Sequence, residues 1–135
     1  MELVPLLRSL SEASGVSGYE DKVRDIVRET FVELSDEVRS DAMGNLIALR
    51  RGSGEMEPRR RIMLAGHMDE IGLMVTMLEE GFLRFTQVGG FDVRTLLSRR
   101  VAVQTHFGDL HGVMAAARPI HVMTEEERKK LPEIT

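Results

Sequence analysis

The 135-residue chain carries a net charge of −4 at pH 7, with 42% hydrophobic and 30% charged residues, which is the balance of one soluble domain. Its acidic balance gives no basis for binding nucleic acid, and the absence of cysteine excludes disulfides and thiolate metal sites. No apolar run reaches the roughly 18 residues of a membrane span and no signal peptide is evident, so a cytoplasmic protein without membrane attachment is expected.

Two amphipathic helices are predicted in the first third of the chain. The leucines of the first follow the i, i+3, i+4, i+7 spacing of one helix face, and Gly15 is expected to end it. Ser17 and Glu20 match a capping box, with Ser17 as the N-cap of the second helix and Glu20 reaching back to it. The apolar residues between Val23 and Leu34 form one face of that second helix.

Short strands are predicted after the helices. Residues 37–42 and 46–50 should form a hairpin, because a Gly-Asn turn signal lies between them. Residues 62–65 are apolar without alternation, which indicates a strand buried on both faces. Thr124 and Glu127 form a second capping box before a short helix. Further strands are predicted at 71–78, 82–85, 101–106 and 112–116.

Helices crowd the first third of the chain and short strands fill the region after about residue 70, which predicts two parts of the chain. Residues 1–70 would form part of an α/β layer, and residues 71–135 would begin a β-rich module. The predicted fold class is therefore α/β.

The strongest functional signal lies at residues 65–72. Residues i and i+2 of a strand face the same side, so His67 and Asp69 are expected to lie together. A neutral imidazole can bind zinc through one nitrogen while a carboxylate orients it through the other. So short a pattern is more often a hydrogen-bonded core histidine beside a loop-capping aspartate. Asp69 and Glu70 are no glycosidase pair, because neighbouring strand residues face opposite sides.

Longer motifs change this interpretation. They are SGYE at 17–20, SDAMGNLIA at 40–48 and AGHMDEIGLMV at 65–75, followed by matching stretches at 88–92, 95–97, 100–101, 108–113, 119–121 and 124–130. In order and spacing they resemble the dizinc glutamyl aminopeptidase family, which includes the tetrahedral (TET) aminopeptidases and whose members are often labelled endoglucanases. The resemblance covers nearly the whole chain.

The resemblance implies the N-terminal part of an α/β/α zinc-peptidase domain, followed by part of an inserted β-barrel dimerisation domain. In that family the histidine matching His67 binds one of two zinc or cobalt ions, and the aspartate matching Asp69 supports the site from behind the ligands. Two such ions polarise a peptide carbonyl and activate water. Family members release N-terminal residues from short peptides and form large homo-oligomers.

The family's other metal ligands and its general base follow the inserted domain, and no residue of this chain is assigned to those roles. The chain is therefore expected to be the N-terminal portion of such an enzyme, inactive alone and binding metal only weakly, since a catalytic zinc takes about three protein ligands. The alternative is a non-enzymatic module that folds and self-associates through its β-rich part.

A third possibility is a small metal-binding protein. His106, Asp109 and His111 flank the predicted hairpin turn and offer nitrogen and oxygen ligands, and His67 could join His106 or His111. Side chains at a hairpin tip are usually only solvated, and the resembling family does not use these positions for metal.

Overall fold

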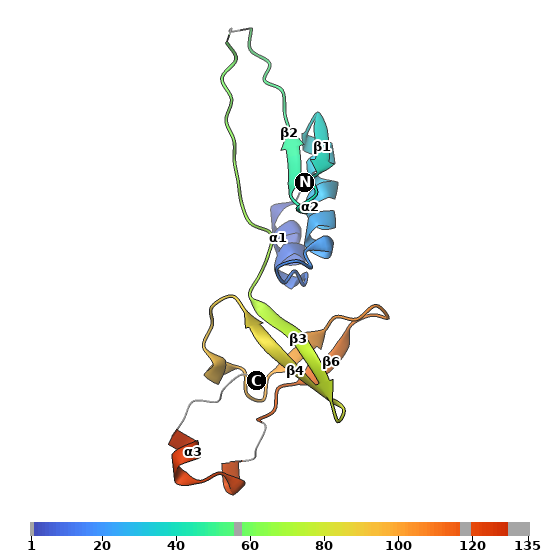
Figure 1. Ribbon diagram of the computed structural model, residues 1–135. Helices are drawn as coiled ribbons and strands as arrows, with labels where there is room; N and C mark the ends of the chain where they lie inside the picture. Colours follow the sequence, from blue (N-terminus) through green and yellow to red (C-terminus); the bar gives the residue numbers. More distant parts are fainter. Residues whose placement is uncertain (1, 56–57, 117–119, 130–135) are drawn as a thin grey trace. The chain divides into compact units, whose positions relative to one another are not determined.

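The computed structural model describes residues 2–55, 58–116 and 120–129 (Figure 1). These residues form helices and two-stranded sheets, which confirms the predicted α/β class. The chain divides into two compact units, Met1–Gly72 and Leu73–Thr135. Within the part of the chain that the structure describes, no helix is both long enough and apolar enough to cross a membrane.

The two predicted helices are present in the first unit. α1 (Leu3–Glu12) and α2 (Asp21–Leu34) contact one another, and α2 also packs against β1 (Glu37–Ser40) and β2 (Leu46–Leu49). Val23, in the first turn of α2, is the one apolar side chain of the described residues that is buried, with 7% of its surface exposed. The unit therefore has a small core, which lies at the beginning of α2.

The capping box predicted at Ser17 is wrong, because α2 begins later. The N-cap is Glu20, whose side chain makes no hydrogen bond to the helix. Its carboxylate accepts instead from the Gly18 amide at 2.8 Å. The Tyr19 amide donates to the Val16 carbonyl at 2.7 Å, and Gly18 has a φ of +88°, so a tight turn separates Ser17 from the helix. A cap must directly adjoin the first helical turn.

The first hairpin forms where the turn signal predicts it. β1 and β2 pair antiparallel. One carboxylate oxygen of Asp41 accepts from the amides of Met43 and Asn45, both at 2.9 Å, and the other accepts from the Asn45 side chain at 2.8 Å. Gly44 has a φ of +86°, a conformation that suits glycine. The hairpin is thus specified by its own turn residues.

The strand predicted at residues 62–65 is not formed. The segment is extended but belongs to no sheet, and Ile62, Met63 and Leu64 are 89–93% exposed (Figure 1). A strand buried on both faces needs hydrogen-bonded neighbours and covering layers. The sheet that the described residues supply in this unit contains only β1 and β2, which pair with each other. The prediction failed because the segment has no partner here.

The described residues of the second unit form two hairpins and three short helical elements. β3 and β4 pair with one another, as do β5 and β6. The strands are β3 (Gly72–Glu79), β4 (Phe82–Val88), β5 (Arg100–Val103) and β6 (Leu110–Val113). The helical elements are η1 (Val93–Thr95), η2 (Ile120–Val122) and α3 (Glu125–Lys129).

Local side-chain chemistry sets the ends of several of these elements. The predicted capping box is confirmed: the Glu127 amide donates to the Thr124 hydroxyl at 3.2 Å, and the Glu127 carboxylate accepts from the Thr124 amide at 2.8 Å. β5 ends earlier than predicted, because Thr105 begins the turn. Its hydroxyl accepts from the Phe107 amide at 3.1 Å, and its carbonyl accepts from the Gly108 amide at 3.2 Å.

Asp92 caps η1 and is expected to titrate unusually low. Its carboxylate accepts from the Arg94 amide at 3.0 Å and from the guanidinium, which lowers the pKa of Asp92 to about 2. This pair favours the folded state above the ordinary carboxyl pKa of 3.8, and the contribution is lost as the pH falls towards 2. Carboxyl-carbon NMR should show the low midpoint, and Arg94→Ala should raise it. An unchanged midpoint in that variant would contradict the assignment.

Candidate metal centre

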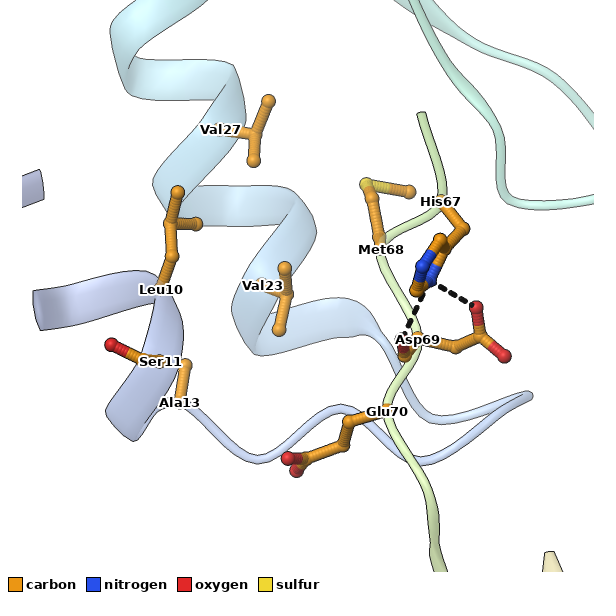
Figure 2. A pocket seen from close by; sticks show the side chains of 9 residues that line it. All are labelled: Leu10, Ser11, Ala13, Val23, Val27, His67, Met68, Asp69 and Glu70. Atoms are coloured by element: carbon orange, nitrogen blue, oxygen red, sulfur yellow. Dashed lines mark hydrogen bonds and ion pairs between the residues drawn. The ribbon is translucent and has the colours of Figure 1, made fainter. Parts of the chain in front are cut away.

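His67 and Asp69 lie on an extended segment that passes the beginning of α2 (Figure 2). The backbone of this segment is anchored at Glu70, which forms a parallel β-bridge with Val16. The described residues add no further strand beside it. His67 and Asp69 are therefore presented by a loop that is fixed directly after them, and not by the predicted strand.

The structure brings His67 and Asp69 into contact. The Nδ1 atom of His67 lies 2.9 Å from the backbone oxygen of Asp69 and 3.1 Å from its Oδ1. Both oxygens are acceptors, so the neutral imidazole carries its proton on Nδ1 and its lone pair on Nε2. The ring is 85% exposed. A largely exposed ring whose Nδ1 hydrogen bonds leave the lone pair on Nε2 has the arrangement of a metal-binding histidine.

A hollow of about 410 Å³ lies between this segment and the two helices. The helices contribute mainly apolar side chains, whereas the segment contributes an imidazole and two carboxylates (Figure 2). The lining residues are Leu10, Ser11, Ala13, Val23, Val27, His67, Met68, Asp69 and Glu70. The hollow is thus mainly apolar on its helical side and carries most of its polar groups on the segment, which suits a ligand site.

The described residues do not complete a metal site. Among them, no group of three or more His, Cys, Asp or Glu side chains is placed to hold one ion. His106, Asp109 and His111 are all described and form no such group. His67 fits a metal ligand by its geometry, but as one donor it would bind an ion weakly.

The sequence did not indicate the contact between Gly15 and Glu70. Gly15 was expected to end the first helix, but α1 ends at Glu12 and Gly15 lies in the following loop. There its amide donates to the Glu70 carboxylate at 3.0 Å, and its carbonyl accepts from the Glu70 amide at 2.8 Å. The sequence offered one signal for this contact, which is the presence of a glycine after the end of the first helix.

Comparison with known proteins finds relatives over most of the chain. The sequence model of the M42 glutamyl aminopeptidases matches residues 44–135. A lysyl aminopeptidase of Pyrococcus furiosus is 37% identical over 116 residues, which cover 84% of this chain and 32% of that protein. The chain thus spans about a third of the length of such relatives.

Solved structures show the same relation. A TET aminopeptidase from the archaeon Thaumarchaeota archaeon SCGC AB-539-E09 superposes with a TM-score of 0.87 at 38% identity, covering 97% of this chain and 35% of that one. The TET1 peptidase of Pyrococcus horikoshii, which can assemble into a tetrahedron or a large octahedral shell, gives 0.76 at 36% identity, with coverages of 98% and 38%. The fold described above is therefore the fold of the corresponding third of these peptidases.

Proposed function

Because the chain belongs to the M42 glutamyl aminopeptidase family, we propose that it contributes one corner of a metal-dependent aminopeptidase centre. His67 would hold one of two divalent ions through Nε2, and Asp69 would fix the ring. The observation that carries this proposal is the pair of acceptors at 2.9 and 3.1 Å from Nδ1. These leave the lone pair of the neutral ring on Nε2.

The two ions, zinc or cobalt, would polarise the carbonyl of the bond to be cut and activate a water molecule. The residues of this chain prepare that chemistry. Asp69 keeps the imidazole in one tautomer and one orientation, and its negative charge makes Nε2 a better donor. The apolar residues of α1 and α2 line the hollow that adjoins these groups. In a protein of the relatives' length, the other ligands and the base would come from residues that this chain does not contain.

The proposed substrates are short peptides, which lose their N-terminal residue. The family name specifies glutamyl residues and the Pyrococcus furiosus relative is a lysyl enzyme, so the preferred residue is left open. We further propose that residues 71–135 begin a β-rich dimerisation domain and that the complete cytoplasmic protein is a homo-oligomer. The assembly of the Pyrococcus horikoshii TET1 peptidase supports the proposal of a homo-oligomer.

An activity assay with controlled metal content tests the proposal. The complete protein should release the first residue from short peptides, should lose this activity when a chelator removes the metal, and should regain it with Zn²⁺ or Co²⁺. The 135-residue chain alone should bind Zn²⁺ only weakly in a calorimetric titration, because His67 has too few neighbouring ligands among the described residues. Activity that survives metal removal would reject the function. Tight stoichiometric binding by the short chain would instead show that it holds a metal site of its own.

A further inference from the structure

We propose that Glu70 is a positioning residue, which holds the His67–Asp69 segment in place through Gly15. The inference rests on the proposed role of His67 as a metal ligand. It assigns a separate task to Glu70, the third polar residue that the segment contributes to the hollow.

Two hydrogen bonds of opposite direction connect Glu70 to Gly15. The Glu70 amide donates to the Gly15 carbonyl at 2.8 Å, and the Gly15 amide donates to Glu70 Oε1 at 3.0 Å. A segment held by one hydrogen bond can still rotate about that bond. Two hydrogen bonds between the same two residues fix the direction of the segment. Since the two residues are 55 positions apart in the sequence, the pair joins the segment to the loop between α1 and α2.

Close backbone packing on both sides of Glu70 strengthens this connection. Gly15 is buried, and a Cβ atom there would lie 2.7 Å from Cγ2 of Val23 and 3.5 Å from the Met68 carbonyl. A Cβ atom on Gly72 would overlap Cγ2 of Val16. Glycine at both places therefore allows the segment to lie directly against the loop. The Met68 carbonyl, which is near Gly15 in this packing, belongs to the residue that follows His67.

The Glu70 side chain is directed away from the His67 ring, which favours a positioning role over metal binding. In Figure 2 its carboxylate points towards the end of α1, whereas the Asp69 carboxylate lies beside the His67 ring. The Glu70 carboxylate is used by a backbone amide of a buried residue. On this proposal the site requires the acceptor oxygen of Glu70, and not the negative charge of its carboxylate.

Three substitutions of Glu70 in the complete protein distinguish the effect of the side-chain length from the effect of the negative charge. Gln keeps the oxygen at the same distance without the charge, Asp keeps the charge but withdraws the oxygen by one methylene, and Ala removes both. We expect E70Q to bind Co²⁺ like the parent protein, whereas E70D and E70A should lose about tenfold in affinity, the lower end of the effect of groups that orient metal ligands. Glu29→Ala, at an exposed position of α2, is the matched control and should change nothing.

The measurements are Co²⁺ affinity by competition with a chromophoric chelator, and hydrogen exchange of the Gly15 amide in the metal-free protein. Exchange should be faster in E70D and E70A and unchanged in E70Q. If E70A does not fold, the comparison of E70Q with E70D still decides the question. Equal losses in E70Q and E70A would show that the charge acts directly and would overturn the proposal, as would full affinity in E70D. Failure of the proposed function would give a different result. His67→Ala would then bind Co²⁺ as tightly as the parent protein, although the Glu70 variants would still change the exchange rate of the Gly15 amide.

Discussion

Replacement of His67 by alanine is expected to lower kcat/KM of the complete protein for short peptides by at least about 100-fold. Loss of a residue that merely orients a metal ligand costs about 10–100-fold, and loss of the ligand itself should cost no less. The folded structure should be unaffected, because the ring is 85% exposed and its hydrogen bonds are confined to Asp69. Steady-state kinetics, together with the metal content after dialysis, measure the effect.

Asp69→Asn is the matched control for this result. Asparagine can still offer an oxygen to His67 Nδ1 but carries no charge, so activity should fall by about tenfold, less than in the His67 variant. Circular dichroism should be the same for both variants and the parent protein. Retention of full activity and full metal content in His67→Ala would show that the imidazole is not a ligand.

Val23→Ala is expected to destabilise the chain, whereas Leu64→Ala is not. Val23 is 7% exposed, and its truncation removes buried apolar volume worth about 2 kcal/mol in the free energy of unfolding. Leu64 is 93% exposed, so the same kind of truncation should change that free energy by less than about 0.5 kcal/mol. Urea denaturation of the 135-residue chain, followed by circular dichroism, gives both values.

The stability of the Leu64→Ala variant also tests whether residues 62–65 are covered in solution. If Leu64→Ala destabilises the chain as much as Val23→Ala does, the segment is buried by another molecule or by a part of the chain that lies elsewhere in this structure. In that case the effect should vary with protein concentration when the covering molecule is a second copy. An equal effect at all concentrations would contradict self-association as its cause.

Elements that are defined by neighbouring residues could be predicted from the sequence. Asp41 and Gly44 form the first hairpin turn among themselves, and Thr124 with Glu127 caps a helix within three residues. Elements that depend on distant partners could not. The strand predicted at 62–65 required a neighbouring strand. The second helix begins after Ser17 because a tight turn precedes it, in a loop that pairs with Glu70 through Val16.

The same distinction applies to the candidate site. His67 and Asp69 are two residues apart, so their contact follows from local spacing, and the resemblance to a peptidase family suggested their roles. The partnership of Gly15 with Glu70 joins residues 55 positions apart and leaves no periodic pattern. Only the folded backbone shows that the glycine is buried against Val23 and so can reach Glu70.

The exposed segment at residues 62–65 affects the solubility of the chain. An extended apolar segment with unpaired amides and carbonyls can add to a copy of itself, which is how edge strands start aggregation. Three arginines at 59–61 directly precede it in the sequence. In-register stacking of identical copies would bring these positive charges together, and charged residues beside an apolar stretch oppose aggregation in this way. Since salt screens such repulsion over about 10 Å at 0.1 M, the solubility of the isolated chain should fall as ionic strength rises.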